Sequence, residues 1–261
     1  MQEVLDNQLT DVLAGLNSAS APSSPGYGHA RRRRGEGAGQ GEAQYQDQGK
    51  QEWASIGVGR DDGKKAGEYS PILYRPSIWN LDSFKTVWLS ETPDKVGSVG
   101  WDASHPRIVT IGHFTHRAQN QKVVAMCTHF DNAGSKARSE SAKLILKLVQ
   151  KEQQGNYGGA NVFVAGDLNS EPDGDAYKIL AAKDSGLVDV QGKAKWKYGD
   201  RNTFTGFNEA RYGEKAAVLD FVFLGGARWG VEGYSVLPNG FEEGVAFSDH
   251  RAVVADLRLG G

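Results

Sequence analysis

Eight polar side chains that could perform chemistry stand at or near the ends of apolar runs in this sequence. They are Glu3, Glu68, His129, Asp167, Asn169, Asp220, Asp249 and His250. Carboxylate and amide oxygens are hard donors that suit Mg²⁺ or Mn²⁺. With only two histidines and no paired cysteines in the set, zinc is disfavoured. A cation held by few carboxylates keeps positions for water and for substrate phosphate oxygens, so the set favours metal-assisted hydrolysis.

The central stretch of the sequence is 162–172. Residues 162–165 are apolar and rich in β-branched types, which predicts a strand buried on both faces. Gly166 then permits a tight change of direction, which places Asp167 and Asn169 at the carboxyl end of the strand. Taken alone, this pattern fits a capped strand-to-helix connection about equally well. The polar groups that end other apolar runs, at 128–129, 219–220 and 248–250, favour a functional site.

A histidine and an aspartate can form a pair that manages a proton, because a carboxylate holds the imidazole in one tautomer and raises its basicity. Asp220 is the expected partner of His250, since Asp249 is its immediate neighbour in a strand and faces the other way. For a single histidine, a hydrogen-bonded structural role is the better interpretation. For the eight residues taken together, a functional site is the better interpretation.

The elements that must position these residues are mostly short strands. We expect strands at 53–59, 68–75, 84–90, 107–114, 122–129, 162–165, 217–224 and 252–257, and helices at 2–16, 135–149 and 175–183. The runs 107–114 and 122–129 are separated by a polar turn and predict a hairpin. Glu3 stands at the start of the first helix, where a carboxylate either caps the helix or projects into a cleft. The pattern predicts an α/β or α+β sandwich of two packed sheets with helices outside them.

The bulk properties set further limits. The 261 residues can form one large domain, and the formal charge of −2 gives no overall attraction to nucleic acid, although a local basic groove would still bind it. No apolar stretch is long enough to span a bilayer. Residues 17–50 are rich in Ser, Pro, Gly, Gln and Arg and predict a disordered insertion, with a solvated loop as the favoured interpretation of the arginine run 31–34. Cys127, the single cysteine, is expected to be a core residue.

Five motifs occur in the order found in the endonuclease/exonuclease/phosphatase superfamily, which includes deoxyribonuclease I. They are Gln2-Glu3, Thr128-His129, Gly166-Asp167-Leu168-Asn169, Leu219-Asp220-Phe221-Val222 and Ser248-Asp249-His250. The segments 57–63, 67–72 and 88–93 resemble bacterial and fungal metal-dependent hydrolases of that superfamily. The resemblance covers nearly the whole chain outside 17–50 and implies a single domain at 1–261. It also implies a four-layered α/β sandwich and Mg²⁺-dependent cleavage of phosphate esters, with Mn²⁺ as the alternative cation.

The resemblance also implies roles for individual residues. Glu3 and Asp249 match the metal-side carboxylates, and Asp167 and Asn169 match the pair that positions the attacking water and the phosphoryl oxygens. His250 with Asp220 matches a histidine–aspartate pair beside the phosphate. His129 matches a second histidine that Glu68 supports, and Arg107 matches an arginine that contacts substrate phosphate. The mechanism implied is in-line attack of water on phosphorus.

The sequence departs from the superfamily at its start. Members begin with a core strand that ends in an asparagine, whereas this sequence begins at the Gln-Glu motif. We therefore expect that the sequence is truncated at its N-terminus and lacks the first core strand. We also expect this chain to have low stability and low activity. The missing segment also leaves the compartment open, since the protein would be secreted if that segment carries a signal peptide and cytoplasmic otherwise.

Substrate choice rests on loops, so the sequence leaves several functions open. The first is a metal-dependent phosphoesterase acting on a phosphomonoester or a phosphodiester. The second is a deoxyribonuclease-like nuclease. From a different class, the chain could be a catalytically inactive scaffold, for which magnesium binding would be unnecessary. We expect a monomer.

Overall fold

The computed structural model describes residues 1–19, 52–155, 161–207, 216–226, 228–240 and 245–260. The strands are β1 (Ala54–Ile56), β2 (Ile72–Tyr74), β3 (Trp79–Trp88), β4 (Ile108–His116), β5 (Lys122–His129), β6 (Asn161–Asp167), β7 (Leu187–Asp189), β8 (Trp196–Gly199), β9 (Asp220–Gly225), β10 (Trp229–Val236) and β11 (Val253–Leu259). The helices are α1 (Asp6–Ala19), α2 (Ser135–Gln154), α3 (Asp175–Leu180) and α4 (Val190–Lys193).

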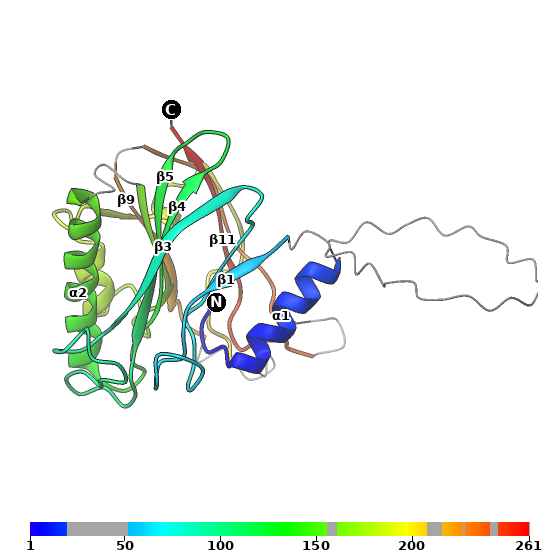
Figure 1. Ribbon diagram of the computed structural model, residues 1–261. Coiled ribbons are helices and arrows are strands. Elements are labelled where there is room, and N and C mark those ends of the chain that lie inside the picture. Colours follow the sequence, from blue (N-terminus) through cyan, green and yellow to red (C-terminus); the bar gives the residue numbers. More distant parts are fainter. Residues whose placement is uncertain (20–51, 156–160, 208–215, 227, 241–244, 261) are drawn as a thin grey trace, which may run out of the picture.

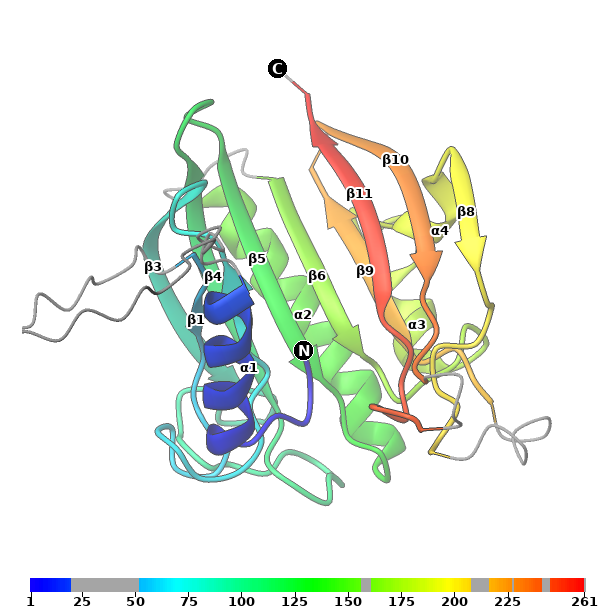
Figure 2. The ribbon, with the colours of Figure 1, turned by 90° about the vertical axis from the view of Figure 1, so that its right-hand side faces the viewer.

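These elements form the layers of an α/β sandwich. Figure 1 shows α2 outside a large sheet, smaller sheets behind that sheet, and α1 on the far side. The large sheet has six strands in the order β3-β4-β5-β6-β9-β7, and the second layer consists of the pair β1-β2 and the three strands β11-β10-β8. Among the described residues, no ladder joins these two smaller sheets. Figure 2 shows α1 and β1 in front of one half of the large sheet, and β11 in front of the other half.

The large sheet carries the main core because its central strands are apolar on both faces. Val162 and Val164 of β6 are almost fully buried and belong to the same cluster as Ile145 and Val149 of α2. On the opposite face, Phe163 packs toward the cluster of β10 and β11. The expected hairpin is confirmed, since β4 pairs antiparallel with β5. Burial on both faces explains why β5 and β6 are continuous apolar runs.

The register of the large sheet determines where the chemistry lies. β5 and β6 run parallel and place His129 opposite Asp167. β9 runs antiparallel to β6 and places Asp220 opposite Asp167. Residues directly opposite one another point to the same face of a sheet. The three side chains therefore form one row across the sheet, at the carboxyl ends of β5 and β6.

Two expectations about local structure were wrong. Gly166 does not turn the chain, because it lies inside β6, where a Cβ would overlap the carbonyl oxygen of Thr128. The turn is made by Asn169, which has a left-handed φ of 44°. The insertion does not begin at Asn17, because α1 continues to Ala19 and the Asn17 amide bonds the backbone of Trp53. The rest of the insertion, with arginines 31–34, lies outside the described residues.

The close approach at Gly166 gives a stability prediction. Gly166→Ala will lower the free energy of unfolding by ~3 kcal/mol or more, because the added methyl group meets backbone that cannot rotate away. Gly15→Ala is the control, since Gly15 lies inside α1 with open space where a methyl group would be added, and the variant should gain up to ~1 kcal/mol. Urea unfolding of both variants checks this. A Gly166→Ala protein as stable as the parent would contradict the close approach.

Candidate active site

The row of His129, Asp167 and Asp220 is buried at one end of three inner strands of the large sheet. Their exposed fractions are 5%, 3% and 8% respectively. Buried ionisable groups are costly unless they are paired or functional. Such a row at the end of a rigid sheet is therefore a candidate for chemistry.

Asn169 is held beside this row by its own turn. Its backbone N–H donates to Asp167 Oδ1 at 2.7 Å, and its side-chain Nδ2 donates to the carbonyl of Phe130 at 3.0 Å. Nδ2 also lies 3.0 Å from His129 Nε2. Since the amide nitrogen is fixed by the Phe130 carbonyl, the amide oxygen remains available to a water or substrate group.

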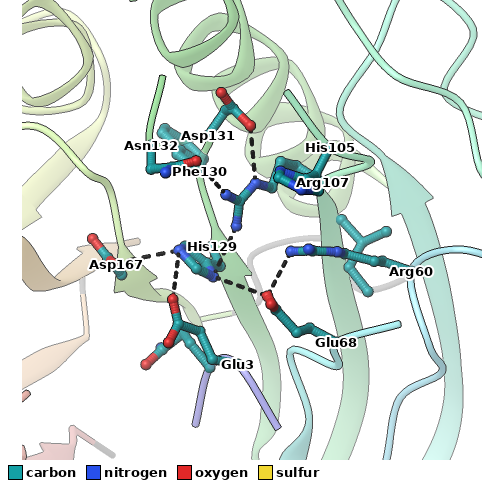
Figure 3. A network of polar contacts seen from close by, with 12 residues as sticks. Glu3, Arg60, Glu68, His105, Arg107, His129, Phe130, Asp131, Asn132 and Asp167 are labelled. Carbon is teal, nitrogen blue, oxygen red and sulfur yellow. Dashed lines mark hydrogen bonds and ion pairs between the residues drawn. The ribbon is translucent and has the colours of Figure 1, made fainter. Parts of the chain in front are cut away.

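Several groups converge on His129, as Figure 3 shows. Arg107 Nη1 lies 3.0 Å from Nδ1, while Asp167 Oδ2 and Glu3 Oε1 lie 3.4 and 3.7 Å from Nε2. Because a guanidinium only donates, Nδ1 accepts from Arg107, and the proton of a neutral ring sits on Nε2, where Asp167 Oδ2 can accept it. Asn169 Nδ2 then contacts Nε2 without a hydrogen bond, because both nitrogens carry hydrogen. Burial, together with the charges of Arg107 and Arg60, lowers the pKa of His129 to about 2. His129 is thus a neutral donor whose Nε2–H faces the site.

Asp220 and His250 form the second part of the site. Asp220 Oδ2 lies 2.7 Å from His250 Nδ1, and His250 Nε2 lies 3.8 Å from Asp167 Oδ2. Burial lowers the pKa of His250, but the hydrogen bond and charge of Asp220, together with the charges of Asp167 and Asp249, outweigh burial and raise the pKa to about 9. Burial, with the charge of Asp220, raises the pKa of Asp167 to about 7. The site therefore places a carboxyl group that titrates near neutrality beside a protonated imidazole.

Glu3 reaches the site from outside the large sheet. It precedes α1 by three residues and has a left-handed φ of 57°, so it does not cap that helix. The backbone carbonyl of the next residue, Val4, accepts a bond from Tyr69 N–H at 2.8 Å, which places Glu3 near Glu68. Glu3, Glu68 and His129 offer ligand atoms within 4.8 Å of one another.

Asp249 and Glu68 differ in how closely they approach the row. The Asp249 backbone carbonyl accepts bonds from Thr205 and Gly206 at 2.9 and 3.0 Å, and its carboxylate interacts electrostatically with Glu3 and His250. Glu68 Oε2 lies 3.9 Å from His129 Nδ1 and pairs with Arg60. The group nearest to His129 Nδ1 is therefore Arg107, not Glu68.

The donor set fits a divalent cation. Burial, followed by the charges of Glu68 and Asp249, raises the pKa of Glu3. Carboxylates that raise one another's pKa are favourable ligands for a hard dication, which removes the repulsion between them. Asp167, Asp220 and His250 form a second group of possible ligand atoms.

Three residues that contact this network were not singled out from the sequence. Asp131 Oδ2 lies 3.3 Å from Arg107 Nε, and Asn132 Oδ1 accepts from Arg107 Nη2 at 3.1 Å. Arg60 pairs with Glu68. The only signal for Asp131 and Asn132 is their position just after a strand and before a helix, where acceptors satisfy free N–H groups. Asp131 Oδ1 does accept from the N–H groups of Ala133 and Gly134.

Asp131 should be a main source of stability for the site. Asp131→Ala will lower the free energy of unfolding by ~3 kcal/mol or more, because it leaves the buried guanidinium of Arg107 without its carboxylate. Asp131→Asn keeps the acceptor for the two backbone N–H groups and will cost less. Asp94→Asn, at an exposed acid, is the control. Chemical denaturation measures all three, and equal stability of the Asp131→Ala protein and the parent would contradict this role.

Comparison with known proteins places this geometry in a family. The profile of the Endonuclease/Exonuclease/phosphatase family matches residues 1–250. An endonuclease/exonuclease/phosphatase from Bacteroides vulgatus is 34% identical with a TM-score of 0.79, and the match covers 99% of this chain and 83% of that one. A mannosyl-6-phosphatase from Bacteroides thetaiotaomicron is 33% identical with a TM-score of 0.72, covering 80% and 78%.

More distant structures share the fold alone. Caenorhabditis elegans TDP2 is 15% identical with a TM-score of 0.62, and the match covers 97% of this chain and 80% of that one. A search of curated protein sequences found no match. The match over residues 1–250 and the two relatives above 30% identity place the chain in the endonuclease/exonuclease/phosphatase family of phosphate-ester hydrolases.

Proposed function

We propose that this protein is a divalent-cation-dependent phosphoesterase that hydrolyses its substrate by in-line attack of an activated water on phosphorus. The observation that carries the proposal is the row of His129, Asp167 and Asp220, completed by His250 at 2.7 Å from Asp220. The row supplies a neutral donor, a carboxyl group with a pKa of about 7 and a histidine–aspartate pair in one place.

Each group of the row has a role in this proposal. Asp167 removes the proton of the attacking water, a task favoured by a pKa close to neutrality. The Nε2–H of His129 donates to a phosphoryl oxygen whose negative charge grows during attack. The free amide oxygen of Asn169 orients the water. His250, held by Asp220, donates to the phosphate on the other side of Asp167.

Arg107 acts in this proposal as a positioning residue rather than as a direct contact to substrate. It is 5% exposed, and its three nitrogens already contact Asp131, His129 and Asn132. Its donor to Nδ1 keeps the proton of His129 on Nε2. Glu68, through its pair with Arg60, supports the same wall of the site.

The cation would be held by Glu3 with Glu68 or Asp249 as further carboxylates. Oxygen ligands favour Mg²⁺, with Mn²⁺ as the alternative. When bound, such a cation polarises a phosphoryl oxygen and neutralises part of its charge.

The test is hydrolysis of p-nitrophenyl phosphate and bis-p-nitrophenyl phosphate with Mg²⁺, Mn²⁺ or EDTA. We expect turnover that requires the cation, and the preferred ester will separate a phosphomonoesterase from a phosphodiesterase. A phosphomonoester belongs in the panel because one relative at 33% identity is named as a mannosyl-6-phosphatase. An oligonucleotide substrate tests the nuclease alternative. Turnover of no ester with any cation, and no cation binding, would favour a scaffold.

A further inference from the structure

The segment 203–206 connects the two parts of the chain that carry Asp220 and His250. It follows β8 and lies between the residues that precede β9 and those that precede β11. Phe204 forms one isolated bridge with Ala217 and another with His250. The hydrogen bonds of this segment therefore determine how the two backbones lie relative to each other.

Thr203 makes the contact on the side of Asp220. Its side chain is fully buried, and its Oγ1 accepts from the backbone N–H groups of Leu219 at 2.9 Å and Asp220 at 3.0 Å. Its backbone carbonyl accepts from the N–H of Arg251 at 2.6 Å. The side chain of Thr203 thus fixes the backbone of Asp220, and its carbonyl fixes the residue after His250.

The hydroxyl of Thr203 takes the place of a strand partner at this end of β9. Among the described residues, β7 pairs with β9 only at the opposite end, at 223–225. Buried backbone N–H groups need an acceptor, and leaving them without one is costly. The Leu219 carbonyl in turn accepts from the N–H of Leu168, directly after Asp167, at 2.9 Å. The bonds of Thr203 therefore continue to the row of the site.

The rest of the segment holds the loop that carries His250. The N–H groups of Thr205 and of the residue after it donate to the carbonyl of Asp249 at 2.9 and 3.0 Å. Asn239, which is fully buried, donates from Nδ2 to Thr205 Oγ1 and to the Ser248 carbonyl, both at 2.7 Å. This loop is held by bonds of its own, so it would not follow a shift of β9.

The contact that depends on this support is short. Asp220 Oδ2 lies 2.7 Å from His250 Nδ1. Groups that take part in catalysis must be held within about 0.5 Å of their productive geometry, and a misplacement of about 1 Å can lower the rate roughly 100-fold. Without the Thr203 hydroxyl, two buried N–H groups would move toward another acceptor, and the carboxylate of Asp220 would move with them.

We infer that Thr203 is a positioning residue of the proposed hydrolysis, whose hydroxyl fixes the backbone of Asp220 and thereby the carboxylate that orients His250. Because its oxygen is buried and already bonded to two backbone donors, Thr203 acts through Asp220 and not on the substrate. Its effect on the rate rests on the proposed function. Its effect on the contact between Asp220 and His250 requires neither substrate nor cation.

The kinetic test compares two substitutions of Thr203. Thr203→Val keeps the shape of the side chain and removes the acceptor, whereas Thr203→Ser keeps the acceptor. For whichever p-nitrophenyl ester the parent hydrolyses faster with Mg²⁺, Thr203→Val should lower kcat about 10- to 100-fold, and Thr203→Ser should stay within about threefold of the parent. Thr110→Val is the matched control, because Thr110 is equally buried and its Oγ1 has no hydrogen-bond partner among the described residues.

Combination with His250→Gln separates positioning from a general loss of structure. If Thr203 acts through the imidazole, Thr203→Val should lower kcat by no more than about twofold once His250 has been replaced. A general disturbance would lower kcat by the same factor with or without the imidazole. Val149→Ala removes packing from the main core and should leave the kcat of the folded protein unchanged.

A spectroscopic measurement tests the contact without substrate or cation. The nitrogen-15 chemical shift of His250 Nδ1 reports its hydrogen bond to the carboxylate, and the signal is assigned by its loss in His250→Gln. We expect Thr203→Val to move this signal toward its position in Asp220→Asn, while Thr203→Ser and Thr110→Val leave it in place. Should Thr203→Val fail to fold, Thr203→Ala replaces it, with a smaller shift in the same direction, because a water molecule can then accept the two N–H bonds.

The outcomes separate this inference from the proposed function. An unmoved His250 signal in the folded Thr203→Val protein, or a loss of kcat that is the same without His250, would overturn the role of Thr203 and leave the phosphoesterase standing. Turnover of no ester by the parent would overturn the proposed function. A moved signal would then still confirm that the Thr203 hydroxyl holds Asp220 against His250.

Discussion

Asp167→Asn will lower kcat for phosphate-ester hydrolysis by roughly 10³-fold, within the range expected for loss of a general base. Asparagine has the same shape and keeps an oxygen to accept the 2.7 Å bond from Asn169 N–H, so the turn after β6 should survive. What is lost is the proton acceptor beside His129 and His250. Steady-state assays with Mg²⁺ measure the change, with Asp94→Asn as control.

Asp167→Asn should raise the stability of the fold at neutral and alkaline pH, although it lowers activity. The pKa of Asp167 is raised in the folded chain from 3.8 to about 7, so its contribution to stability is present below 3.8 and is lost as pH rises through about 7. Without cations, Asp167→Asn should thus be more stable than the parent at pH 8, on the order of 3 kcal/mol. It should also flatten the fall in stability between pH 4 and 8. A variant that is inactive and unstable would indicate a structural role for Asp167 instead.

The second large effect concerns Asp220 and His250, which should act as one unit. Asp220→Asn and His250→Gln will each lower kcat by roughly 10²-fold to 10⁴-fold, because the first removes the negative charge 2.7 Å from the imidazole and the second removes the imidazole. The double variant should be little worse than the poorer single variant, since residues that act together are not additive.

A pH profile of the same proteins gives a second readout. The pKa of His250 is raised to about 9 despite burial, by its bond to Asp220. Asp220→Asn should therefore move the alkaline limb of the rate profile to lower pH, while His250→Gln should remove it. Additive losses in the double variant, or an unchanged alkaline limb in Asp220→Asn, would contradict a coupled pair.

Long, regular apolar patterns were enough to predict the central elements. β5, β6 and α2 bury wide apolar surfaces, so their periodicity is visible in the sequence. The same regularity predicted the strand ends that carry His129 and Asp167. The register that aligns them with Asp220 became visible only in the structure, because it depends on how three distant strands pair.

The elements that the sequence did not predict lack such a pattern. Every residue of β8 is exposed, so this strand depends on backbone pairing with β10 and shows no apolar alternation. β10 contains Gly230 and Gly233, which are more typical of a loop. Glycine at 233 leaves room for the indole of Trp196, which occupies the space where a Cβ would lie. Tertiary packing, not local preference, determines both strands.

The candidate site shows the same division. Residues at strand ends could be predicted from chemistry and position, whereas Asp131, Asn132 and Arg60 act through loops whose course the sequence does not reveal. Gly166 was misinterpreted as a turn because the nearby carbonyl of Thr128 belongs to a neighbouring strand.

Among the described residues, none of the helices has the length and apolar character needed to cross a bilayer.

The most direct test of the central claim is hydrolysis of p-nitrophenyl phosphate in water enriched in oxygen-18, with Mg²⁺ present. Attack of water on phosphorus predicts that the released phosphate carries one heavy oxygen and that the alcohol carries none. Labelled phosphate should be formed at least ~100-fold more slowly by the Asp167→Asn variant, and also by the parent protein in EDTA. Heavy oxygen in the alcohol, or labelled phosphate formed equally fast without the cation or without Asp167, would contradict a cation-dependent phosphoesterase at this row.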